Sequence, residues 1–148
     1  MKRQMLILKG PGSSGKSTTT KAAFDMFLQW AIKKRKSSTV QFLYLTGREV
    51  AAVVEVGEES IGIATRGDSE FHVKQGLAFF AAHKCKVVLC ATRSKGKPLA
   101  VAQRFALARL GVTATEVAKR KDKGTLIQQE ENLKASKRLT QWLKLACR

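Results

Sequence analysis

Residues 10 to 17 have types and a spacing suited to holding a phosphate group. Gly10 and Gly15 enclose four residues and are followed directly by Lys16 and Ser17. Glycines let the backbone approach an anion closely, and the N–H groups at a helix start then point toward it. A lysine ammonium adds positive charge, and a serine hydroxyl can ligate magnesium. The sequence therefore predicts a phosphate site formed by Gly10, Gly12, Ser13, Ser14, Gly15, Lys16, Ser17 and Thr18.

Alternating strands and helices are predicted to position this loop. Apolar runs rich in Val, Ile and Leu predict strands at residues 5–9, 40–45, 51–56, 61–65, 86–91 and 112–117. Helical spacing of apolar residues predicts helices at 17–34, 70–83, 98–110 and 125–145. This order favours one α/β domain over residues 1–148, with three layers and a mostly parallel sheet of five or six strands. A meander in the middle of the chain would make the sheet mixed.

The loop between its strand and its helix resembles the P-loop NTPase superfamily, and the resemblance covers residues 10–17. It implies that the chain binds a nucleoside triphosphate with Mg²⁺. Lys16 would then lie between the β and γ phosphates, Ser17 would ligate the metal, and Thr18 could reach the α phosphate. ATP is favoured over GTP because the chain has no Asn-Lys-x-Asp segment to read guanine.

A carboxylate is needed to hold the metal or to take a proton from the attacking group. The apolar run 86–91 ends without Asp or Glu, unlike the corresponding strand of motor and switch ATPases. Asp68 follows the run 61–65 directly after Arg66 and Gly67, and we expect it to act as general base and metal ligand. Capping of the next helix is an equally open role for Asp68. A second acid could be Glu49, Glu55, Glu58 or Glu59, all of which could equally be solvated turn charges.

Phosphoryl transfer also needs cations for the equatorial oxygens. Arg66 and Arg93 both follow apolar strands, and we expect them to be catalytic. Arg120 lies in a basic stretch, residues 119–124, that could close over a nucleotide. Each of these arginines could instead be an ordinary surface cation.

The charge of the chain points to a polyanionic partner. Its 28 Lys and Arg residues against 11 Asp and Glu residues give a formal net charge of +17. Charge of this size attracts nucleic acid, although a solvated basic surface is the alternative. With 148 residues there is no room for the machinery of helicases or transporters, and the chain most resembles the small P-loop kinases.

We therefore expect transfer of the ATP γ-phosphate to a hydroxyl of a nucleic acid, with DNA favoured over RNA. The hydroxyl could belong to a hydroxymethylated base, as in phage P-loop kinases that modify DNA, or to a 5′ end. One alternative is an ATP-gated nucleic-acid-binding switch. Another is a small nucleoside, nucleotide or metabolite kinase with an incidentally basic surface. The sequence leaves the oligomeric state open.

Other features exclude further classes of protein. No apolar run is long enough for a membrane span or a signal peptide, so we expect a cytoplasmic protein of a bacterium or a phage-infected host. The three cysteines show no paired spacing, and His83, Cys85 and Cys90 match no common zinc pattern. Trp30 and Trp142 lie on apolar helix stripes, which favours core packing over base stacking.

Overall fold

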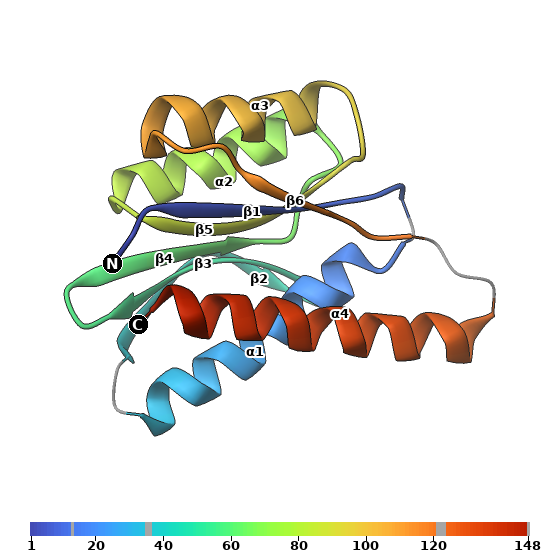
Figure 1. The fold of residues 1–148 in the computed structure, drawn as a ribbon, viewed down its shortest axis with the longest axis horizontal. Coiled ribbons are helices and arrows are strands. Elements are labelled where there is room, and N and C mark those ends of the chain that lie inside the picture. Colours follow the sequence, from blue (N-terminus) through green and yellow to red (C-terminus); the bar gives the residue numbers. More distant parts are fainter. Residues whose placement is uncertain (13, 35–36, 121–123, 148) are drawn as a thin grey trace.

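The computed structural model describes residues 1–12, 14–34, 37–120 and 124–147, although not the side chains of residues 37 and 38. Strands and helices alternate along much of the chain (Figure 1). In chain order the elements are β1 (Gln4–Lys9), α1 (Lys16–Lys33), β2 (Ser37–Thr46), β3 (Glu49–Val56), β4 (Glu59–Ala64), α2 (Glu70–Ala82), β5 (Val87–Thr92), α3 (Lys97–Phe105), the π-helix η1 (Ala106–Leu110), β6 (Thr115–Ala118) and α4 (Thr125–Ala146).

The strands form one six-stranded mixed sheet in the order β2-β3-β4-β5-β1-β6. β4, β5, β1 and β6 run parallel, and Ile7 of β1 pairs with Cys90 of β5 on one side and Glu116 of β6 on the other. β2, β3 and β4 form an antiparallel meander. The expected α/β class with a mostly parallel sheet is confirmed, and the meander makes the sheet mixed.

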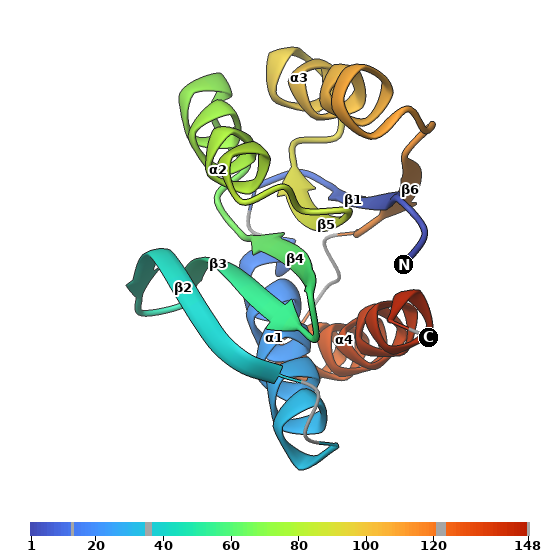
Figure 2. The same ribbon diagram turned by 90° about the vertical axis from the view of Figure 1, so that its left-hand side faces the viewer.

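Helices cover both faces of the sheet. α1 and α4 lie side by side on one face, and α2 and α3 cover the other (Figure 2). Successive side chains of β1 point to opposite faces of the sheet. Met5 and Ile7 lie in the core under α2 and α3, and Leu6 and Leu8 lie in the core under α1 and α4. Every residue of β5 is buried, as expected for a parallel strand covered on both faces.

Most predicted elements agree with the structure to within two residues, and three differ more in their bounds or regularity. The helix expected over 98–110 is α-helical only as far as Phe105 and then widens into the π-helix η1. Gly111 ends it in a left-handed conformation with φ of 67°. The last strand begins at Thr115 rather than at 112, because Val112 and Ala114 pack against the α2–α3 core before the chain enters the sheet. β2 is ten residues long and exceeds its predicted bounds at both ends.

The remaining sequence expectations concern thiols, tryptophans and membrane spans. Burial raises the pKa of the Cys85 and Cys90 thiols to about 12, so both behave as core side chains. Trp30 and Trp142 are only half-buried and pack at the margin of the core between α1, α4 and the sheet. Within the part of the chain that the structure describes, no helix has the length and apolar character needed to cross a membrane.

Candidate active site

The loop between β1 and α1, called here the glycine loop (residues 10–15), lies at the carboxyl end of the central strand β1. The N–H of Gly10 donates to the Thr92 carbonyl at 3.2 Å, which ties the loop to the end of β5. A side chain at Gly10 would collide with the Lys119 carbonyl beyond β6. The chain leaves β1 through α1 for β2 at the far edge of the sheet, and it later crosses over β1 from β5 to β6 on the other side. Open α/β sheets bind ligands at such a switch point.

α4 holds the outer side of the glycine loop. The Gln128 amide donates to the Ser14 carbonyl at 3.0 Å and to Asn132 Oδ1 at 2.8 Å. Gly15 has φ of 85° and lies so close to the Asn132 amide that a Cβ would overlap it. Gln128 and Asn132 were not predicted as site residues, since polar residues on a long helix carry no distinguishing signal in the sequence.

Gly15→Ala is expected to destabilise the chain more than Gly96→Ala does. Both glycines have positive φ, at 85° and 88°, but the space around Gly96 is open. The left-handed conformation alone costs an L-residue about 1–2 kcal/mol, so the excess at Gly15 measures the overlap with Asn132. Urea unfolding of both variants, alone and with Asn132→Ala, tests this. Equal losses, or no recovery with Asn132→Ala, would show that the contact does not constrain the loop.

Lys16 starts α1 and is almost wholly buried, with 7% of its surface exposed. Its ammonium donates to the Gly10 carbonyl at 2.6 Å, so it folds back over the glycine loop. Burial lowers the pKa of Lys16, and the nearby Asp68 carboxylate partly opposes this effect. The structure thus holds a desolvated cation at the centre of the loop.

A pH dependence of stability follows from Lys16. Because folding lowers its pKa from 10.5, the unfolded chain binds more protons between the lowered value and 10.5. The free energy of unfolding of the wild type should therefore rise, relative to that of Lys16→Met, as the pH is raised toward 10.5. Urea unfolding of both proteins at about pH 8 and about pH 10 measures the difference, in which shifts of other groups cancel. A difference that stays constant or falls with pH would contradict the prediction.

Asp68 follows β4 and Arg93 follows β5, and both side chains approach Lys16 from the ends of these two adjacent strands. Asp68 Oδ1 lies 3.4 Å from Lys16 Nζ and 3.5 Å from Arg93 Nε. Gly67 allows this approach, since a side chain there would collide with the Ala91 carbonyl, and its own carbonyl accepts from Arg93 N at 3.2 Å. Arg93 also lies beside the glycine loop, with Nη2 3.8 Å from the position of a Cβ on Gly12.

Capping of α2 is done by Ser69. Ser69 Oγ accepts from the His72 N–H at 3.1 Å and lies 2.8 Å from His72 Nδ1. The carboxylate of Asp68 is not used for this cap and is 64% exposed toward the cavity. The two roles left open for Asp68 are therefore separated, since its neighbour performs the structural one.

Lys16, Asp68 and part of the glycine loop line a cavity of about 470 Å³. Its second wall comes from the end of β4 and the β2–β3 turn. Thr65 Oγ1 donates to Glu49 Oε2 at 2.6 Å, and Arg48 lies beside Glu49. The lining residues are Gly12, Ser14, Gly15, Lys16, Ser17, Thr18, Arg48, Glu49, Thr65, Arg66, Gly67, Asp68 and His72.

Arg66 lines the cavity without reaching the Lys16–Asp68 pair. The Arg66 guanidinium lies over the Tyr44 ring, 4.2 Å from the ring centroid. The backbone N–H of Arg66 donates to Tyr44 Oη at 3.0 Å. Burial raises the pKa of Tyr44, so this phenol stays neutral and supports the Arg66 side chain. Of the two predicted arginines, the structure therefore brings only Arg93 into contact with Asp68.

Other predicted residues lie elsewhere or outside the described residues. Glu55, Glu58 and Glu59 lie at the β3–β4 turn, at the opposite end of the sheet, where Glu59 pairs with Lys86. Arg120 lines a separate cavity between α4 and the β1–β6 pair. Ser13 is not among the described residues. Of the four candidate second acids, Glu49 does line the cavity, together with Arg48 and His72, which were not predicted. The antiparallel register of the meander and the first turn of α2 place these three residues at the carboxyl edge of β4.

The described residues were also compared with the requirements of a metal ion. Among residues 1–12, 14–34, 37–120 and 124–147, no group of three or more His, Cys, Asp or Glu side chains could hold a metal by itself. Ser17 and Asp68 nevertheless line the same cavity. This donor set fits Mg²⁺, which keeps several waters and takes one or two protein ligands together with phosphate oxygens.

Comparisons with known proteins identify no relative, so the interpretation of the site rests on its geometry. No family model, no curated protein and no solved structure matches the chain.

Proposed function

We propose that the chain is an ATP-dependent phosphotransferase of the P-loop kinase type, acting on a hydroxyl group of a nucleic acid. One observation carries the proposal. The carboxylate of Asp68 lies 3.4 Å from the buried ammonium of Lys16 and 3.5 Å from Arg93, directly beside the glycine loop. A cation, an acid and an array of loop N–H groups at one strand edge are what phosphoryl transfer requires.

The chain's own residues have distinct roles in this proposal. When bound, ATP with Mg²⁺ supplies the phosphoryl group and neutralises part of its charge. Lys16 binds phosphate oxygens in place of the Gly10 carbonyl, and Arg93 stabilises the negative charge that develops during transfer. The Ser17 hydroxyl and the Asp68 carboxylate would be the protein ligands of Mg²⁺. Asp68 also accepts the proton of the attacking hydroxyl. The hydroxyl oxygen then bonds to the γ phosphorus, the bond from this phosphorus to the bridging oxygen breaks, and ADP leaves.

The second wall supports a bound acceptor rather than water alone. Arg66, which the Tyr44 ring supports from behind, contributes a cation to this wall, and Glu49 contributes an acid. The net charge of +17 favours a polymeric acceptor, because a phosphate chain uses a broad positive surface and a small metabolite does not. A target inside a duplex would have to be flipped out to reach this cavity.

A switch that binds nucleic acid under the control of ATP is the second candidate. The end of β5 suits the weak hydrolysis of such a switch, because the strand ends in Thr92 and is followed by Arg93 rather than by an acid. Its hydrolysis would be slow and would release only free phosphate. A small-metabolite kinase, the third candidate, predicts turnover that nucleic acid does not change.

A transfer assay separates the three candidates. The protein is incubated with γ-labelled ATP, Mg²⁺ and one acceptor at a time: nucleosides, DNA and RNA with 5′-hydroxyl ends, and DNA with hydroxymethylated bases. The expected result is label on a polymer, and Arg93→Gln should lower the rate about 100-fold while Arg104→Gln, on α3, leaves it unchanged. Label only in free phosphate would support the switch, and label only on a small molecule would support the metabolite kinase.

A further inference from the structure

A second basic surface lies on the outer side of the α1–α4 layer, away from the candidate active site. It is a groove of about 510 Å³ between the second halves of the two helices. Its lining residues are Met26, Gln29, Trp30, Lys33, Lys137, Thr140, Gln141 and Lys144. We call it the α1–α4 groove. Trp30 lies fourteen residues beyond Lys16 on the same helix, which places it about 20 Å from the glycine loop.

The charge of the α1–α4 groove is uncompensated. Three of its lining residues are lysines, and none is an acid. Lys21, nearer the start of α1, pairs with Asp25, and Lys134 of α4 pairs with Glu131. Within the described part of the chain, the ammonium groups of Lys33, Lys137 and Lys144 form no such ion pair. The groove therefore presents positive charge that an anionic partner can neutralise.

An aromatic ring lies among these cations. Trp30 stacks on the buried ring of Phe27, with centroids 5.8 Å apart and an interplanar angle of 29°. The Phe27 ring fixes the indole from one side, and Lys144 Nζ lies 5.9 Å from the Trp30 ring centroid. Trp30 is half-buried and lines the groove, so part of a rigidly held indole is accessible there.

We propose that the α1–α4 groove binds single-stranded nucleic acid, with Trp30 stacking on a base and Lys33, Lys137 and Lys144 contacting phosphates. A positive groove that tracks a backbone and an aromatic ring for the bases is the usual combination for such binding. Anionic lipid would also meet the lysines, and tryptophan is common at membrane–water interfaces, so lipid vesicles form a separate arm of the test. The inference shares its partner with the proposed function, but it does not depend on phosphoryl transfer.

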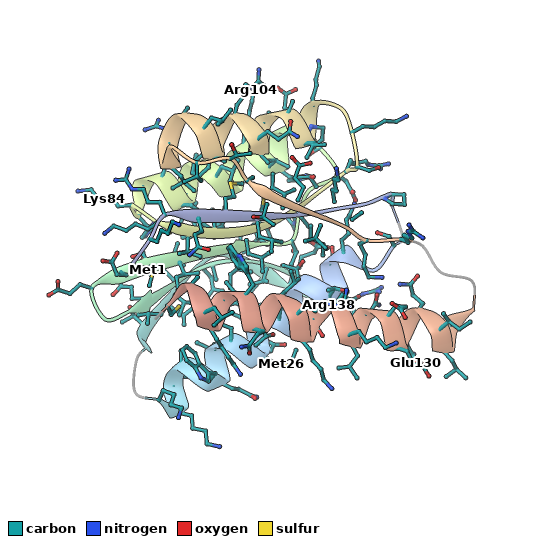
Figure 3. The ribbon with its side chains drawn as sticks, viewed as in Figure 1. Met1, Met26, Lys84, Arg104, Glu130 and Arg138 are labelled. Atoms are coloured by element: carbon teal, nitrogen blue, oxygen red, sulfur yellow. The ribbon has the colours of Figure 1, made fainter. Side chains whose placement is uncertain are left out.

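A salt titration tests the lysines. Binding of a fluorescent thymidine oligonucleotide of about 20 nucleotides is measured without ATP at several salt concentrations. The variant Lys33→Gln/Lys137→Gln/Lys144→Gln should lower the slope of log affinity against log salt by about 2, since each single-strand phosphate contact contributes about 0.7. The matched control is Lys84→Gln/Arg104→Gln/Arg109→Gln. It removes the same charge, and Figure 3 shows Lys84 and Arg104 on the layer opposite Met26 and Arg138.

The stacking of Trp30 has its own readout. In a Trp142→Phe background Trp30 is the only tryptophan, and the oligonucleotide should quench its fluorescence. Trp30→Leu should weaken binding about tenfold, and Trp30→Phe should restore most of the affinity. Thermal unfolding of each variant shows whether the fold survives. If Trp30→Leu does not fold, quenching of Trp30 in the Trp142→Phe background still tests the stacking.

Three results would overturn the assignment. Equal slope losses in the groove variant and its control would show diffuse attraction to the whole surface. Unquenched Trp30 fluorescence at saturating oligonucleotide would remove the stacking role. Binding to anionic lipid vesicles without binding to the oligonucleotide would assign the groove to a membrane surface. The groove assay contains no ATP and measures binding alone, so failure of the transfer chemistry and failure of the groove are separate outcomes.

Discussion

Lys16→Ala should reduce ATP turnover about 10³-fold, one of the two largest effects that we expect from a single substitution. The side chain supplies the one buried cation of the cavity, and its ammonium already hydrogen-bonds within the glycine loop, to the Gly10 carbonyl at 2.6 Å. Removing it leaves the loop N–H groups without the charge that would neutralise the transferring phosphate. Initial rates of γ-phosphate loss from ATP measure the effect.

Lys21→Ala is the matched control for this substitution. Lys21 also lies on α1, but its ammonium pairs with Asp25 at 2.9 Å, away from the cavity. Its loss should change turnover less than about twofold, as expected of an exposed ion pair. A Lys16→Ala protein that folds and turns over ATP at the rate of Lys21→Ala would remove the glycine loop from the chemistry.

Asp68→Asn should reduce phosphoryl transfer by about 10²- to 10⁴-fold while the protein still binds ATP. The substitution preserves the shape of the side chain but removes its charge and its ability to accept a proton. Lys16 and the loop N–H groups remain, so binding of a fluorescent ATP analogue should persist. Single-turnover transfer and analogue binding, measured on the same preparation, separate the two effects.

Two further variants sharpen the assignment of Asp68. Asp25→Asn removes an acid of α1 that pairs with Lys21, and it should leave transfer unchanged. Glu49→Gln removes the other acid of the cavity, which Thr65 holds at 2.6 Å. Transfer that survives Asp68→Asn but fails in Glu49→Gln would make Glu49 the general base and leave Asp68 a positioning role.

The sequence predicted the parts of the fold that depend on local pattern. Buried parallel strands read as continuous apolar runs, so β1 and β5 were found close to their observed bounds. The start of α1 was predicted within one residue, because the glycine loop and Lys16 mark where a helix should begin. Asp68 was chosen as a candidate site residue because it follows a strand, and the structure places it on the cavity. Its neighbour Ser69, rather than Asp68, caps the next helix.

The second wall of the cavity could not be predicted, because it depends on register between distant segments. Glu49 reaches the carboxyl edge only because β3 runs antiparallel to β4, with Ala51 opposite Ala64. Asn132 reaches Gly15 only because α4 crosses back over the start of α1. Trp30 was expected in the core from its helical spacing, but the groove beside α4 leaves it half-buried. Periodicity identifies the face of a helix, but not how far its neighbours cover it.

The position of β1 in the sheet has a consequence for the order in which the chain folds. Met5 pairs with Val88 and Leu8 pairs with Val117, so the first strand finds both of its neighbours only after most of the chain is present. The meander of β2, β3 and β4 has local contacts and can form early, whereas closing the long loops around β1 is slow. During synthesis the apolar run of β1 therefore stays unpaired until β5 and β6 have been made, and in that time it can associate with other chains. The glycine loop, which follows β1, acquires its final geometry among the last parts of the molecule.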